Sequence, residues 1–199
     1  MECHGATAEG KPVFDAGPVG RVVGPNLTPA ALGSRYDADA MAAAIRHGVG
    51  PGGKPLRFMP ADDFNNLSDA DTAAIVRHLQ SLPPSDHAPG ETALGPVGRV
   101  LYLFGKLNWV PAEHIDHAPR VRTAPASAPT AEYGAYLAQV CTGCHGAQGR
   151  AGPDGYYPRL AGKPEGYLYN QLLHIRDGRR HYAPMRALLE PLTDAYLLE

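Results

Sequence analysis

The sequence predicts an all-α protein in which one small helical unit occurs twice, joined by a connector that is partly apolar. Cys-His-Gly occurs at residues 3–5 and again at 144–146. Each copy is followed by a loop rich in Gly and Pro, a helix, and a loop with one methionine beside a proline. A helix capped by Ser or Thr before Asp then ends each half. We therefore expect domains at residues 1–85 and 131–199, with the connector over 86–130.

The second copy of the motif is complete and reads Cys-Thr-Gly-Cys-His over residues 141–145. Two thiols one helical turn apart can each form a thioether to a vinyl group on the same porphyrin edge, with the next imidazole held under the iron. A structural zinc would need two further Cys or His ligands nearby, and none follows. A thioredoxin-like Cys-x-x-Cys has no use for the histidine. The motif indicates a c-type haem attached to Cys141 and Cys144, with His145 on the iron.

The first copy of the motif lacks its first cysteine. Cys3 and His4 follow only Met1 and Glu2, so we expect the upstream thiol and the opening helix to precede residue 1. We likewise expect the final helix to be cut at Glu199. Haem 1 would then be weakened or lost in a chain of this length. A chance dipeptide at a chain end is the alternative, but the repeat favours haem over a whole domain. No cysteine is left for a disulfide.

Composition limits the possible functions. The 199 residues carry a net charge of −2 with 19% charged residues, and no basic block suggests nucleic acid. No apolar stretch reaches the length of about 18 residues that a membrane span needs. The 23 Gly and 20 Pro indicate long loops between short helices. Two haems would supply apolar cores that such small domains otherwise lack.

The first half is expected to contain two helices after a long loop. Residues 6–36 are interpreted as loop, with a corner at Pro25. Asp37 is a plausible N-cap for a helix through His47, which Gly48 ends. Met41 lies within that helix and is interpreted as a core residue.

The second helix of this half follows the methionine loop. Met59 lies beside Pro60 at the end of a loop over 51–60. Ser68 then caps a helix with Asp71 in a variant of the capping box, and Pro83 ends it.

The connector has two parts. Residues 94–110 are apolar apart from cations such as Arg99 and Lys106, so they cannot span a membrane. Residues 118–130 are typical of an extended Pro/Ala linker. The apolar part is either a strap packed over one domain or a docking surface for a partner subunit.

The second half repeats the order of the first. Thr130 can cap a helix that leads to Cys141, and Pro158 forms a corner. Pro164 begins a helix that Gly178 ends. A loop with Met185 follows, and Thr193 caps the last helix.

This order of elements resembles the class I cytochrome c family over about 85 residues at the start and about 70 at the end. In that family the histidine of the haem motif is the proximal ligand, a proline orients it, and a methionine covers the other haem face. The resemblance therefore implies two c-type haems, one per domain. It implies these iron ligands: His4, Met59, His145 and Met185. It implies these thioether and orienting residues: Cys3, Cys141, Cys144, Pro25 and Pro158.

Other side chains compete for these roles. A lone methionine is more often core filler than ligand, but Met59 and Met185 each lie beside proline at equivalent places. The histidines that could replace a methionine are His47 and His78 for the first iron, and His174 and His181 for the second. We interpret these four as surface residues. The cations that could pair with haem propionates are Arg57, Arg159 and Arg180.

An iron with His and Met on its two faces has no open position for substrate, so the predicted function is electron transfer rather than catalysis. Tandem domains with a long apolar connector resemble the cytochrome subunits of bacterial periplasmic dehydrogenases. That resemblance implies a dehydrogenase catalytic subunit as electron donor and quinone or a terminal cytochrome as acceptor. It also implies a periplasmic location, an export signal and any third domain beyond this sequence, and membrane association only through missing segments or a partner.

Two other functions are weighed against electron transfer. A dihaem peroxidase or a sulfur-oxidising haem enzyme needs one iron that is open or has a displaceable ligand. The two methionines beside prolines argue against both enzymes, and no spare cysteine remains for sulfur chemistry. A gas or redox sensor would need a fused signalling module, which the sequence lacks.

Overall fold

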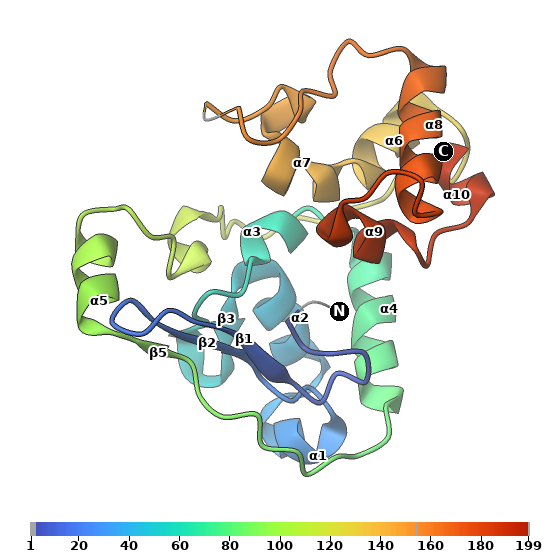
Figure 1. Cartoon of the computed structure of the whole chain (residues 1–199). Helices are drawn as coiled ribbons and strands as arrows, with labels where there is room; N and C mark the ends of the chain where they lie inside the picture. The colour runs from blue at the N-terminus through green and yellow to red at the C-terminus, as the bar shows by residue number, and fades with distance from the viewer. Residues whose placement is uncertain (1–2, 154, 199) are drawn as a thin grey trace. The chain divides into compact units, whose positions relative to one another are not determined.

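The computed structural model describes residues 3–153 and 155–198 and divides the chain into two compact units, Met1–Thr123 and Ala124–Glu199 (Figure 1). This division differs from the expected separate connector over residues 86–130. Most of that segment belongs to the first unit, because it forms a strand, buries a tryptophan and hydrogen-bonds to the preceding elements.

Two helices that the sequence predicts form the core of the first unit. Helix α2 (Ala38–His47) begins at Asp37, whose side chain accepts a hydrogen bond from the amide of Ala40 at 2.8 Å. Helix α4 (Asp69–Ser81) begins at Ser68, which accepts from the Asp71 amide at 3.0 Å. Both predicted caps are confirmed. Between the two helices lie the buried side chains of Leu32, Met41, Ile45 and Val76, so the core role expected of Met41 is also confirmed.

The first unit also contains short strands, so the all-α prediction is wrong for this half. Strands β1 (Lys11–Asp15), β2 (Gly20–Gly24) and β5 (Ala93–Leu94) form an antiparallel sheet in the order β1-β2-β5. A second small sheet joins β3 (Val49–Gly50) to β4 (Lys54–Pro55). Residues 6–36 were expected to be loop. Their pairing depends on β5, which is about 70 residues away in the chain and leaves no local pattern.

Shorter elements complete the first unit (Figure 1). Helix α1 (Pro29–Leu32) continues into the 3₁₀ turn η1 (Gly33–Arg35), and helix α3 (Ala61–Phe64) lies between the methionine loop and α4. The 3₁₀ turn η2 (Pro51–Gly53) links β3 to β4.

The apolar part of the connector is a strap on the first unit, one of the two interpretations that the sequence left open. Its helix α5 (Pro96–Leu103) contacts β2, and its 3₁₀ turn η3 (Pro111–His114) contacts α3. Trp109, between them, is buried with 6% exposure. The Thr92 hydroxyl donates to the carbonyl of Val23 and accepts from its amide, both at 2.9 Å. These contacts fix the strap against the sheet.

The second unit is helical throughout the residues that the structure describes. Its helices are α6 (Ala131–Leu137), α7 (Gln139–His145), α8 (Glu165–Arg176), α9 (Ala183–Leu189) and α10 (Asp194–Leu198), with the 3₁₀ turn η4 (Ala147–Gly149). Thr130 and Thr193 accept hydrogen bonds from the amides of Tyr133 and Tyr196, both at 3.2 Å. Met185 was expected in a loop but lies in the first turn of α9, because Pro184 is well suited to that turn. No helix in residues 3–153 and 155–198 is both long and apolar enough to cross a bilayer.

An arginine makes equivalent contacts in the two units. Arg46, in the last turn of α2, forms a 2.6 Å ion pair with Asp69 at the start of α4. Arg176, in the last turn of α8, forms a 2.6 Å ion pair with Asp194 at the start of α10. Each arginine also donates to a carbonyl just before that last helix, on Leu67 at 2.8 Å and on Leu192 at 3.1 Å. The segment with the methionine is thus closed in the same way in both halves.

Candidate haem-binding sites

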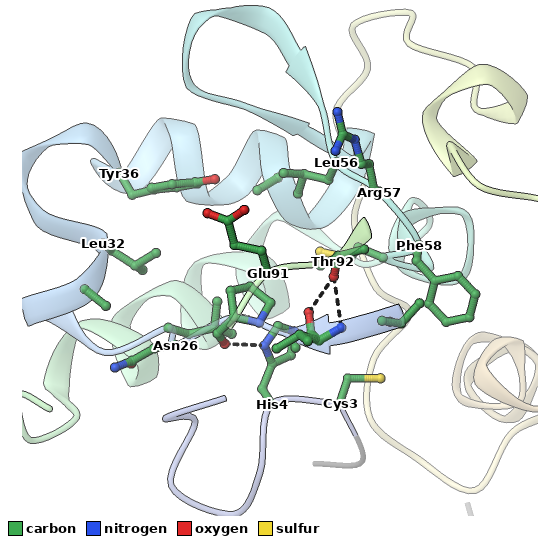
Figure 2. Close-up of a pocket in the computed structure, with 18 of the residues that line it drawn as sticks. Cys3, His4, Asn26, Leu32, Tyr36, Leu56, Arg57, Phe58, Glu91 and Thr92 are labelled. Carbon is green, nitrogen blue, oxygen red and sulfur yellow. Dashed lines mark hydrogen bonds between the residues drawn. The ribbon is translucent and has the colours of Figure 1, made fainter. Parts of the chain in front are cut away.

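A cavity of about 780 Å³ lies at the centre of the first unit (Figure 2). Strand β2, helices α1 and α2, the loop before Met59 and the strap residues 90–92 all contribute to its walls. Most of its wall is aliphatic, including Val22, Val23, Leu27, Leu32, Met41, Ile45 and Leu56. A cavity with such walls suits a large, flat, apolar group.

Cys3 and His4 lie together at one side of this cavity (Figure 2). The Nδ1 atom of His4 is 2.9 Å from the carbonyl oxygen of Pro25. A carbonyl only accepts, so Nδ1 carries the proton and Nε2 keeps its lone pair. Burial lowers the pKa of His4, although the hydrogen bond to Pro25 opposes this shift. A neutral imidazole with a fixed tautomer is the form that binds a metal.

Met59 also lines the cavity and packs, half-buried, against the core formed by α2 and α4. The competing histidines do not line it. His47 contacts His117 instead, with 3.2 Å between their Nδ1 atoms, and His78 is exposed on α4. Met59 is therefore the residue that the structure places beside the cavity for the second ligand position.

Charged groups line the same cavity. They are the cations Arg35, Lys54 and Arg57 and the carboxylate of Glu91. Figure 2 shows Glu91 between Leu32 and Leu56, near the hydroxyl of Tyr36. Cations beside an apolar cavity suit a ligand that is apolar in its body and carries carboxylates at one edge. Of these groups, only Arg57 was singled out from the sequence.

The second unit holds its motif on α7. Cys141 and Cys144 are three residues apart and so lie on one face of this helix. Burial raises the pKa of the Cys141 thiol, whereas Cys144 is exposed. His145 is 5% exposed, and its Nδ1 atom is 2.8 Å from the carbonyl oxygen of Pro158. This histidine therefore has the same tautomer as His4, with Nε2 unprotonated.

The backbone around the two histidines is also equivalent. Each histidine carbonyl accepts a hydrogen bond from the amide six residues later, on Gly10 and on Ala151, both at 2.8 Å. The carbonyl four residues after each histidine, on Ala8 and on Gly149, accepts from the amide two residues after the proline, on Leu27 and on Leu160, again at 2.8 Å. The glycine after each histidine has a positive φ, +77° at Gly5 and +74° at Gly146. One loop structure therefore holds both imidazoles.

Tyr157 is a residue of the second site that sequence reasoning missed. Its ring lies edge-on to the His145 ring, with 5.9 Å between centroids. A hydrogen bond to Tyr182 raises the pKa of Tyr157 to about 12, with Cys144 adding to the shift. Tyr182 is the N-cap of α9, so this bond ties the histidine loop to the helix with Met185. Its position next to Pro158 was the available signal.

The remaining candidates of the second unit lie outside this cluster of contacts. Met185 and His174 are half-buried, and His181 is exposed. Arg159 donates to the Ala161 carbonyl at 3.0 Å, and Arg180 donates to the Gln171 side chain at 2.7 Å. These two arginines make local bonds that a propionate would have to replace.

The residues present fit a covalently attached haem in both units. Each has a neutral imidazole with an unprotonated Nε2, a thiol beside it, and a methionine one helix further along the chain. All three cysteines are within the described residues, and none is in a disulfide. The comparison with known families agrees, because the family model for cytochrome c matches residues 1–83 and 131–191. The chain belongs to the cytochrome c family. Membership implies covalently bound c-type haem in this cytochrome.

Known relatives of this cytochrome serve in electron transfer. Over 58 residues it is 48% identical to the thiosulfate dehydrogenase electron acceptor of Thiomonas intermedia (strain K12), covering 29% of this chain and 27% of that protein. Cytochrome c4 of Azotobacter vinelandii is 29% identical over 170 residues, or 82% of this chain and 67% of the relative. The fructose dehydrogenase cytochrome subunit of Gluconobacter japonicus is 30% identical over 125 residues, 63% of this chain and 21% of that subunit. The matched regions thus span from about a fifth to two thirds of these relatives.

Proposed function

We propose that this cytochrome is an electron carrier with two haems, one per unit, each held between a histidine and a methionine. One observation carries the proposal: the same imidazole-to-proline hydrogen bond occurs in both units, at 2.9 Å for His4 and 2.8 Å for His145. A tautomer fixed twice by the same loop supports two proximal ligands rather than one. The two matched regions of the family model support the same count.

The residues of each unit have separable roles in this proposal. The thiols of Cys3, Cys141 and Cys144 attach the cofactor, and the two histidines present Nε2 to the metal. Bound haem supplies an iron that gains and loses one electron at a time. The thioethers of Met59 and Met185 occupy the opposite position, which favours the reduced state and leaves no position for a substrate. The aliphatic wall of the first cavity excludes water.

The names of the relatives support a partner class for this chain. Relatives are described as an electron acceptor for a thiosulfate dehydrogenase and as the cytochrome subunit of a fructose dehydrogenase. We propose that this chain accepts electrons from the catalytic subunit of a dehydrogenase and passes them to quinone or a terminal cytochrome outside the cytoplasm. The exposed apolar side chains of the strap are a candidate docking surface: Val97, Val100, Leu103 and Phe104.

Haem content and electron capacity test this proposal. The exported, haem-loaded protein should contain two haems per chain after alkaline pyridine treatment and should take up two electrons reversibly in a redox titration. It should not turn over hydrogen peroxide. A single haem per chain would contradict the relay. A high-spin haem with peroxide turnover would support the peroxidase-like alternative.

A further inference from the structure

Phe58, the residue before Met59, has an unusual backbone conformation. Its φ is +61°, in the left-handed region that an aromatic side chain rarely adopts. Its amide donates to the carbonyl oxygen of Trp109 at 2.8 Å. Its ring lies edge-on to Phe14, with 5.3 Å between centroids, and 6.1 Å from the Trp109 ring. Contacts from two distant segments therefore hold this conformation.

The strap also holds the residues on the other side of Met59. The amide of Ala61 donates to the carbonyl of Met59 at 2.8 Å, and Ala61 begins α3 with no exposed surface. Turn η3, which follows Trp109, contacts α3 with Ala112 buried. Met59 thus lies between two backbone positions that one strap segment, residues 109–114, contacts from the same unit. Figure 2 shows Phe58 at the edge of the cavity, where its backbone leads into the methionine.

The second unit fixes its methionine differently. Met185 is in the first turn of α9, with Pro184 before it and Tyr182 as N-cap. Its backbone is helical, and the helix itself restrains it. In the first unit the restraint comes from about 50 residues further along the chain.

We propose that strap residues 109–114 are a positioning element for Met59: through Trp109 and Phe58 they hold the thioether at the first iron, whereas the second site works without them. This inference rests on the proposed function, because it takes Met59 as an iron ligand. A left-handed residue released from its partners relaxes to another backbone region, which would redirect the side chain that follows it. The strap then sets how tightly the first methionine is bound, and with it the potential of the first haem.

The test uses the haem-loaded protein with Met185→Ala as background, so that the methionine-to-iron charge-transfer band reports the first site alone. We expect Trp109→Leu and Phe58→Leu each to weaken this band. We expect at least a tenfold gain in apparent affinity for added imidazole at the first iron, and a lower potential. Trp109→Phe should restore most of the band. The matched control is Phe104→Leu, in the same strap but 76% exposed, which should leave all three readouts unchanged.

Hydrogen exchange gives a readout that does not depend on the iron. Amides of residues 56–60 should exchange at least tenfold faster in Trp109→Leu, while those of α8 keep their rates. Phe58→Leu keeps the buried tryptophan, so it tests the idea even if Trp109→Leu does not fold.

The outcomes separate the two proposals. No charge-transfer band in the Met185→Ala background would overturn the ligand role of Met59. A band that is present there, disappears with Met59→Ala and persists unchanged in both strap variants would overturn the positioning role alone.

Discussion

The Nδ1 atom of His145 lies 2.8 Å from the carbonyl oxygen of Pro158, and the ring is 95% buried. The bond fixes the tautomer of an imidazole that the surrounding loop holds in place. Because His4 and Pro25 repeat the arrangement at 2.9 Å, the two units present the same nitrogen to their cofactors. The predictions below test the elements that hold these sites together.

Arg46 closes the segment with Met59, and its loss should destabilise the first unit. Its side chain is 13% exposed and donates to the Thr72 hydroxyl at 3.0 Å and to the Leu67 carbonyl at 2.8 Å. Hydrogen bonds from a charged donor contribute about 1.5–3 kcal/mol. Arg46→Gln should lower the free energy of unfolding by about that amount, measured by urea denaturation. Arg77→Gln, on the exposed surface of α4, should change it little, and equal losses in both variants would refute this role.

The ion pair of Asp69 predicts a dependence of stability on acid. Its hydrogen bond with Arg46 lowers the pKa of Asp69 from 3.8. A carboxylate with a lower pKa in the folded state adds stability above its unfolded pKa and loses it as the pH falls through the folded pKa. Unfolding midpoints should therefore decrease below about pH 4, less steeply in Asp69→Asn. In an Arg46→Gln background the same Asn substitution should have almost no effect. An effect of the same size there would contradict the pairing.

Gly24 is required by the close approach of the N-terminal segment. A Cβ atom at this position would lie 1.8 Å from the backbone oxygen of Cys3. Gly24→Ala should therefore displace Cys3 and His4 and reduce haem content from two per chain toward one, measured as the pyridine haemochrome. The control is Gly166→Ala in α8, where a Cβ meets nothing within 4 Å. Two haems per chain in Gly24→Ala would show that the segment has room to move.

The bond between Tyr157 and Tyr182 predicts a tyrosine that titrates late. The hydrogen bond to Tyr182 is the largest cause that raises the pKa of Tyr157 to about 12. In the haem-free protein, Tyr182→Phe should return this pKa toward 10.0, followed by NMR of ¹³C-labelled tyrosine. Tyr133→Phe, on α6, should not change the Tyr157 titration. A Tyr157 pKa near the ordinary value in the unsubstituted protein would exclude the bond.

Local signals in the sequence were enough for the helix boundaries. Asp37, Ser68 and Thr130 each precede a helix, and each accepts the hydrogen bond that a cap requires. Features that depend on distant pairing were missed. Strand β2 pairs with Ala93–Leu94, and the strap folds back so that Trp109 is buried. No local pattern encodes either contact, and the short strands are rich in glycine.

The candidate site shows the same limit. The repeat alone was sufficient to select His4, His145 and the two prolines, and the structure places each imidazole on its proline carbonyl. The contacts around Phe58 could not be predicted, because its positive φ depends on a tryptophan about 50 residues away. Tyr157 was missed because its partner, Tyr182, lies 25 residues further along the chain.

The most direct test of two closed His/Met sites is the ferric optical spectrum of the haem-loaded, exported protein, normalised to haem per chain. We predict two low-spin haems and a methionine-to-iron charge-transfer band that falls by about half in Met59→Ala and in Met185→Ala, and disappears in the double variant. A high-spin haem without the band in the unsubstituted protein would contradict the account, because an open iron is suited to substrate chemistry rather than to electron transfer alone.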